Sequence, residues 1–295
     1  WATLISCYDR FITAYPHHPE TPIVQFERIL VLFHSGQYDE ASAATRLYSS
    51  SDAPVALRMR AQLIHIQEMM RKGQRDEATH ALLASDWAPD TMPEQAVLAF
   101  TALDLGESLM DAGDYEQAIR VYRLVPHYHA LVEGQKKQIR VARERMARLA
   151  ARTPDGNGLI WQSHYTHLID RMEERLGALE SSGDYTAGFL LRYGRCLLHA
   201  GHVPEAWVLF RTLADNTGVS HEIGEQAHYH WILASHELGR FAETFQLCLD
   251  FARLFPGHEL LPATQYLLAC AYEDAGKPDD AHRVLSALME AYPSH

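Results

Sequence analysis

The sequence predicts an all-α protein built from helical hairpins that stack side by side, and three observations support this. Ala, Leu, Glu, Gln and Arg dominate nearly every segment, and apolar residues recur at intervals of three and four, as on the buried face of a helix. No alternating run of β-branched residues reaches the length of a strand. A six-residue phrase that begins with glycine recurs along the chain, which indicates one repeated supersecondary unit.

The recurring phrase marks the turn between the two helices of a hairpin. The copies read GQYDEA, GQRDEA, GDYEQA, GHVPEA, GRFAET and GKPDDA, and they begin at Gly36, Gly73, Gly113, Gly201, Gly239 and Gly276. Apart from the interval between the third and fourth copies, successive glycines lie 37 to 40 residues apart. Glycine adopts the left-handed conformation that ends a helix, and the final alanine, replaced once by Thr244, lets the second helix approach the first closely.

Each hairpin carries an apolar stripe on both of its helices. In the hairpin around Gly113, Leu105 and Leu109 precede the turn, and Ile119 and Tyr122 follow it. One hairpin cannot bury both stripes by itself, so a neighbour must cover each of them. The pattern therefore predicts a solenoid of fourteen or fifteen helices without a sheet.

The first helix is expected over residues 1–15. Trp1 falls where the aromatic residue of the turn phrase belongs, so this segment corresponds to the second helix of a hairpin whose first helix is missing. Because repeat arrays normally end in polar caps, we expect the chain to be part of a longer chain or a complex. An open apolar edge is expected on the face formed by Leu4, Ile5, Tyr8 and Phe11.

One joint interrupts the repeat. A long basic helix is predicted over residues 135–152 and a further helix over 159–181. The segment between them, 153–158, contains one proline and two glycines and cannot continue a helix. The sequence therefore predicts an N-terminal subarray at 1–152, a linker or hinge at 153–158 and a C-terminal subarray at 159–295.

The basic helix has a marked excess of positive charge, with Glu144 as its single acidic residue. Three interpretations are open: pairing within this chain or simple solvation, contact with an acidic protein partner, and contact with nucleic acid or lipid headgroups. The cationic residues are Lys136, Lys137, Arg140, Arg143, Arg145, Arg148 and Arg152.

Charge and hydropathy argue against two classes of partner. The 26 basic and 38 acidic residues give a net charge of −12, which opposes a general affinity for nucleic acid or anionic lipid. No window contains eighteen uninterrupted apolar residues, so no membrane insertion is expected. The 18 histidines would become protonated in acid, so the surface charge should change strongly with pH.

No cofactor, metal or catalytic residue is expected. The histidine pairs 164/167, 199/202 and 228/230 lack the glutamate spacing of a zinc helix, and the four cysteines form no C-x-x-C pair. A serine elbow or phosphate loop needs a strand-to-helix geometry that the chain lacks. The protein is therefore not expected to be an enzyme.

The turn phrases resemble those of the tetratricopeptide repeat (TPR) family. GDYEQAIRVY, which begins at Gly113, is similar to the inter-helix turn of that family, and the Leu105-Gly106 pair fits its first helix. The resemblance covers most of the chain, although residues 127–182 have no clean match. It implies a right-handed superhelical solenoid whose concave groove binds a protein or peptide.

Two links suggest a narrower resemblance. AYPHHPETP at 14–22 and LFPGHELLP at 254–262 each place an aromatic-proline pair 20 residues before the next turn glycine. They resemble the longer-linked repeats of bacterial envelope proteins, such as the lipoprotein of the outer-membrane barrel-assembly machinery and the periplasmic coordinator of the Tol system. This implies a periplasmic or outer-membrane-associated protein, with the cytoplasm as the alternative.

The family register places particular side chains in the inner groove. Those favoured as partner-binding residues are Arg60, Arg71, Tyr229, His236, Glu237, Tyr266, Glu273 and Asp274, with Leu63 and Gln67 beside the arginines. The groove of residues 184–295 is expected to be the main site and to prefer a basic and apolar segment. In the alternative, its tyrosines only pack between hairpins. The lysine positions of the family's chaperone-tail clamp hold Phe26, Leu63, Leu103, Tyr229 and Tyr266, so chaperone C-termini are not expected to bind.

These expectations describe a non-catalytic scaffold for protein–protein interaction, and the second resemblance implies a role in bacterial envelope assembly. The alternative is a ligand-sensing or regulatory domain of a larger protein, which a deep, closed apolar pocket would favour.

We expect limited proteolysis to cut the native chain first within residues 153–158, because proline and glycine there replace a packed turn. The fragments, sized by mass spectrometry, should each be near half the length of the chain. Resistance at this segment with earlier cleavage elsewhere would contradict a hinge.

Overall fold

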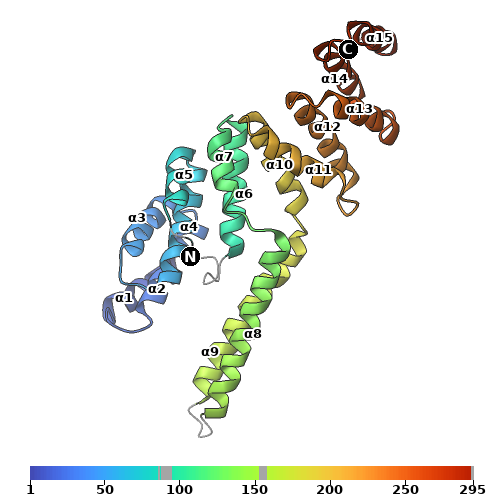
Figure 1. Cartoon of the computed structure of the whole chain (residues 1–295). Helices are drawn as coiled ribbons and strands as arrows, with labels where there is room; N and C mark the ends of the chain where they lie inside the picture. Colours follow the sequence, from blue (N-terminus) through green and yellow to red (C-terminus); the bar gives the residue numbers. More distant parts are fainter. Residues whose placement is uncertain (86, 88–94, 153–157, 294–295) are drawn as a thin grey trace. The chain divides into compact units, whose positions relative to one another are not determined.

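The computed structural model describes residues 1–85, 87, 95–152 and 158–293. This part of the chain forms fifteen α-helices and no strand, which confirms the all-α prediction (Figure 1). The first nine helices are α1 (Ala2–Ala14), α2 (Thr21–His34), α3 (Tyr38–Ser49), α4 (Val55–Arg71), α5 (Arg75–Leu83), α6 (Gln95–Asp111), α7 (Tyr115–Tyr122), α8 (Tyr128–Arg152) and α9 (Gly158–Ser182). The remaining helices are α10 (Thr186–His199), α11 (Val203–Ala214), α12 (His221–Glu237), α13 (Phe241–Leu254), α14 (Leu261–Asp274) and α15 (Pro278–Ala291).

The helices form two compact units. The N-terminal unit comprises Trp1–Ala112 and Arg120–Asp184, and the C-terminal unit comprises Gly113–Ile119 and Tyr185–His295. This division differs from the boundary predicted at 153–158, because α8 and α9 pack against each other within the N-terminal unit. Residues 153–157 lie outside the described part of the chain, so the hinge stays a prediction.

The turn phrases form the predicted hairpin turns. All six phrase glycines have positive φ angles, between 69° and 82°, which favour glycine over any other residue. The small residue that ends each phrase is buried, as close approach of the two helices requires. These residues are Ala41, Ala78, Ala118, Ala206, Thr244 and Ala281.

Glycines on first helices provide a second point of close approach. A Cβ added at Gly106 would overlap the ring of Tyr122, and a Cβ added at Gly194 would lie 2.7 Å from the ring of Phe210. Tyr122 and Phe210 are among the largest fully buried side chains. The two helices of these hairpins are therefore held together by an aromatic ring packed on glycine backbone.

The two aromatic-proline links share one hydrogen-bonded form. The backbone N–H of Glu20 donates to His18 Nδ1 at 3.2 Å, and that of Leu260 donates to His258 Nδ1 at 3.0 Å. In both links the backbone N–H of the histidine also donates to the backbone carbonyl of the aromatic residue, at 3.2 Å. The similarity seen in the sequence is thus a similarity of conformation.

The α8–α9 pair departs from the repeat. Each helix has 25 residues, and the two lie side by side along their length in Figure 1. Ile139, Ala142, Ile169 and Met172 form the buried seam between them. The predicted basic helix lies within α8, and the predicted helix at 159–181 is α9.

Part of the positive charge of α8 is neutralised by carboxylates of α9. Arg143 pairs with Glu173, and Lys136 lies 3.4 Å from Glu180. These pairs favour the interpretation of the basic helix as charge pairing within the chain. They are solvent-exposed, so each stabilises the hairpin by only about 0–1 kcal/mol.

The first helix has an incompletely covered face. No residue of α1 is buried, Leu4 is 40% exposed, and Ile5 packs against the core of α2, α3 and α4. Of the four residues predicted to form an open apolar edge, only Leu4 is exposed, and Ile5, Tyr8 and Phe11 are partly buried. None of the described helices has the length and hydropathy needed to cross a membrane.

Two glycines of α10 test the close-approach argument. Gly194→Ala should lower the free energy of unfolding by about 1–3 kcal/mol, because the added methyl group overpacks against Phe210. Gly188→Ala, in the same helix with nothing within 4 Å of the added carbon, should raise it by up to about 1 kcal/mol. Urea unfolding followed by circular dichroism would measure both, and equal effects would contradict the proposed contact.

Candidate binding surfaces

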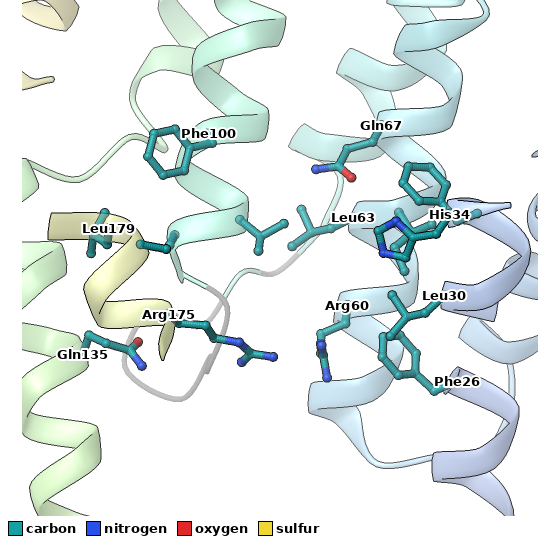
Figure 2. A pocket seen from close by; sticks show the side chains of 15 residues that line it. Phe26, Leu30, His34, Arg60, Leu63, Gln67, Phe100, Gln135, Arg175 and Leu179 are labelled. Carbon is teal, nitrogen blue, oxygen red and sulfur yellow. The ribbon is translucent and has the colours of Figure 1, made fainter. Parts of the chain in front are cut away.

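A cavity of about 440 Å³ lies within the N-terminal unit (Figure 2). Side chains from α2, α4, α6, α8 and α9 form its walls, which are mainly aliphatic and aromatic. The apolar lining residues are Phe26, Leu30, Phe33, Leu63, Ile64, Ala96, Val97, Phe100, Ala178 and Leu179. This size and lining are typical of a site for a small ligand or for a few side chains of a partner.

The polar groups of this cavity are cationic or neutral. Arg60 comes from α4 and Arg175 from α9, and Figure 2 shows both side chains reaching into the same space. His34, Gln67 and Gln135 complete the polar lining. Among the described lining residues there is no Asp or Glu, although acidic residues outnumber basic ones in the chain.

Arg60 is positioned by an aromatic ring. Its guanidinium carbon lies 4.5 Å from the centroid of Phe26, which is 1% exposed. A cation over an aromatic face is attracted to the ring and held in a defined direction. The Gln67 amide is also fixed, because Nε2 donates to Thr101 Oγ1 at 3.0 Å.

The predicted groove residues of α4 separate into two groups. Arg60, Leu63 and Gln67 line the cavity. Arg71 does not line it; its guanidinium lies 4.7 Å from the ring centroid of Phe33 and donates to Tyr38 Oη at 2.8 Å. Arg71 therefore holds α4 against the α2–α3 hairpin.

A second, larger hollow of about 900 Å³ adjoins the first, and Arg175 lines both. Its charged lining, among the residues described, consists of Arg123, Lys137, Arg145 and Arg175. Sequence reasoning identified Lys137 and Arg145 as part of the basic helix but did not identify Arg123 or Arg175. No repeat match covers α9, so the register could not locate Arg175.

The first helices of the C-terminal unit expose an aromatic residue together with acidic residues. Tyr266 is 56% exposed, and Glu237 and Glu273 are also exposed. Tyr229 is only partly exposed and packs against the core of α12, α13 and α14; this burial raises the pKa of its hydroxyl. Tyr229 therefore packs between hairpins, as the alternative interpretation expected, whereas the Tyr266 side chain is exposed to solvent.

His236 and Asp274 join the first helices of neighbouring hairpins. The His236 ring nitrogen Nε2 lies 3.0 Å from Asp274 Oδ2. Both predicted groove residues therefore already have a partner within the unit. A binding partner at this face would meet them as a pair.

Of the histidine pairs considered for metal binding, the side chains of residues 164 and 167 lie outside the described part of the structure, whereas those of His228 and His230 pack inside the C-terminal unit. Within the described residues, no group of three His, Cys, Asp or Glu side chains could hold a metal ion. His228 is buried and lies 3.3 Å from the Leu247 carbonyl, and His230 stacks on Phe210 at 5.1 Å. Cys196 and Cys248 are buried free thiols, and burial raises their pKa values to about 11 and about 12.

One comparison with known protein families found a match, at the C-terminal hairpin. Residues 263–295, which include α15 and most of α14, match the model of the family described as "Tetratricopeptide repeat". This match supports the TPR resemblance at the C-terminal hairpin. No curated protein matches the chain.

Two crystal structures of nearly identical TPR-like repeats from a putative kinesin light chain of Podosopora anserina are similar to the chain, one of them a point variant. The variant is 14% identical, with 94% of this chain and 97% of the other covered and a TM-score of 0.35. For the second structure the identity is 14%, the coverages are 95% and 99%, and the TM-score is 0.34.

His230 should make the C-terminal unit less stable in acid. Burial, with Arg195 and His199 nearby, lowers the pKa of His230 to about 4, whereas an unfolded histidine titrates near 6.5. Between these values the unfolded state binds more protons, so the free energy of unfolding falls as pH falls. The drop from pH 7 to pH 4.5 should be about 2 kcal/mol smaller in His230→Phe than in the native chain.

Urea unfolding at the two pH values would measure this difference. His282→Gln, which changes an exposed histidine of α15, provides the control and should keep the native drop. An unchanged drop in His230→Phe would show that His230 is not buried in its neutral form.

Proposed function

We propose that the chain is a non-catalytic scaffold that binds a protein or peptide segment on the inner faces of its hairpin arrays. The observation that carries this proposal is Tyr266, a large aromatic side chain that is 56% exposed on the first helix of a hairpin. Tyrosine offers a large contact area at low cost in conformational entropy and is enriched at binding hot spots. Helical-repeat arrays commonly use such faces for extended protein contacts.

The charge around Tyr266 indicates the kind of segment that would bind there. Glu237, Glu273 and Asp274 are all exposed, and Asp274 lies beside the partly exposed His236. Carboxylates accept charge-assisted hydrogen bonds from Lys and Arg. A segment with basic and apolar side chains therefore fits this face best.

Location in the bacterial envelope is part of the proposal. It rests on the aromatic-proline links at 14–22 and 254–262, which resemble each other in sequence and in hydrogen bonding. The partner would then be a component of an envelope assembly. The cytoplasm is the alternative location.

A second candidate function is the binding of a small ligand. One observation favours it: the cavity of about 440 Å³ in the N-terminal unit, with its apolar walls and few polar groups. Ligand binding there is compatible with a scaffold role for the C-terminal unit, because the two sites use different residues.

Peptides selected from a random library for binding to the whole chain would test the scaffold function. Enriched sequences should combine Lys or Arg with large apolar residues. Tyr266→Ala should weaken the binding of such a peptide about tenfold, because it removes the exposed aromatic anchor. Glu273→Lys should also weaken peptide binding, and the loss of affinity should be larger at low salt than at high salt, because salt screens the charge repulsion.

Leu249→Ala is the matched control, because Leu249 is similarly exposed on the second helix α13. Affinity should be measured by calorimetry on variants whose thermal midpoints equal that of the native chain. Undiminished affinity in Tyr266→Ala, Tyr229→Ala and Glu237→Lys would rule out this face as the binding site.

A further inference from the structure

The hollow of about 900 Å³ in the N-terminal unit has a lining that is both apolar and cationic. Arg123, Lys137 and Arg145 line it and are exposed to solvent. Among the lining residues that the structure describes there is no Asp or Glu, although the chain has 38 acidic and 26 basic residues. The hollow is therefore opposite in charge to the chain as a whole. The aliphatic side chains of its walls are Leu98, Leu124, Val125, Leu131, Val141 and Leu168.

The cations of α8 lie in two rows along the helix. Lys136 and Arg143, seven residues apart, pair with carboxylates of α9. Lys137 and Arg145, eight residues apart, line the hollow instead. Within the part of the chain that the structure describes, the side chains of Lys137, Arg145 and Arg123 form no ion pair or hydrogen bond. The charge of this second row is therefore left for a partner to neutralise.

We propose that this hollow binds an acidic amphipathic helix of a partner protein, in which two carboxylates flank a large aliphatic side chain on one face. The carboxylates lie against Lys137 and Arg145, and the aliphatic side chain lies against Val141 between them. This surface is opposite in charge preference to the face around Tyr266, and the proposal does not rest on binding there.

The register of α8 sets the spacing of the partner's side chains. Lys137, Val141 and Arg145 follow one another at intervals of four residues, so they lie in one row along the helix. At a rise of 1.5 Å per residue, the two cations are about 12 Å apart along the helix axis. Val141 is 37% exposed between them. A helix with acidic, aliphatic and acidic residues at the same intervals presents the complementary row.

The lining favours a protein segment over nucleic acid or an anionic membrane. Trp87 is the aromatic side chain among the described lining residues; it is 8% exposed, and its Nε1 donates to the Leu82 carbonyl at 2.6 Å. It therefore offers no exposed ring on which a base could stack. Binding to phosphates depends on many accumulated cations, which the net charge of −12 opposes.

The apolar wall and the cations have different roles in binding. Exposed ion pairs contribute little affinity each, whereas burial of an aliphatic side chain contributes more. Charges at the rim decide which partners can approach, because they attract an acidic segment and repel a basic one. We therefore expect the leucine of a partner to supply affinity and its carboxylates to supply selectivity.

Fluorescence anisotropy with labelled peptides tests the proposal on the whole chain. Each peptide has about 20 residues, a length at which an isolated helix can form. The acidic probe carries glutamate, leucine and glutamate at intervals of four residues, and two matched probes replace both glutamates by glutamine or the leucine by alanine. At low salt the acidic probe should bind about tenfold more tightly than either matched probe, and added salt should reduce its advantage over the glutamine probe.

Substitutions in α8 locate the charged contacts. Lys137→Gln and Arg145→Gln should each weaken binding of the acidic probe about threefold, and the double variant should weaken it about tenfold. Binding of the glutamine probe should stay nearly unchanged. Arg140→Gln is the matched control, because it removes an exposed cation of the same helix outside the lining of the hollow, and it should keep the native affinity.

Val141→Gln tests the apolar contact without changing the charge. It should weaken binding of the acidic probe about fivefold, because the aliphatic contact between the two cations is lost. Val208→Gln, at an exposed position of α11 in the C-terminal unit, is the control and should bind the probe as the native chain does.

The outcomes decide between partner classes. Equal affinity for the glutamate and glutamine probes, native affinity in the double variant, or no binding to a chain with the native thermal midpoint would overturn the proposal. It would also be overturned if a single-stranded DNA oligonucleotide or phosphatidylglycerol vesicles bound more tightly than the acidic probe and lost binding in the double variant. None of these results bears on peptide binding at Tyr266, which uses residues of the C-terminal unit.

Discussion

The close approach of the two helices in each hairpin is the constraint on which the structure depends. At each turn, the recurring six-residue phrase ends in a buried alanine or threonine. Farther from the turn, the rings of Tyr122 and Phe210 pack directly on the backbone of Gly106 and Gly194. Small residues on one helix and large rings on the other fix the distance between the helix axes. Once that distance is fixed, each hairpin presents the same apolar faces to its neighbours, and stacking follows.

This constraint explains why so much of the fold could be predicted from the sequence. A glycine with positive φ followed by a small residue is a local signal, and it recurs six times at nearly constant spacing. The positions of the repeat hairpins follow from these local signals, whereas the basic helix is predicted from its run of cationic residues. The family register also located Arg60, Leu63 and Gln67 on one face of α4, because that face is set by the turn at Gly73.

What the sequence could not provide is the pairing of distant segments. Arg175 contributes to the cavity only because α9 packs along α8, and no repeat signal covers either helix. Arg123 lies after the end of α7, where no periodic pattern indicates its direction. Similarly, Tyr229 and Tyr266 occupy the same register position on α12 and α14, and only their packing shows that one is half-buried while the other is exposed.

The α8–α9 hairpin shows how a departure from the repeat creates a site. The other described helices have between 8 and 17 residues, whereas α8 and α9 have 25 residues each. Their seam of Ile139, Ala142, Ile169 and Met172 is buried between the two helices themselves, so their length does not depend on a neighbouring hairpin. Side chains of α9 are therefore available to form a wall opposite α4. A face that a regular repeat would leave as a groove is bounded here on a further side by α9, and a pocket of this size can bind a ligand much smaller than a protein segment.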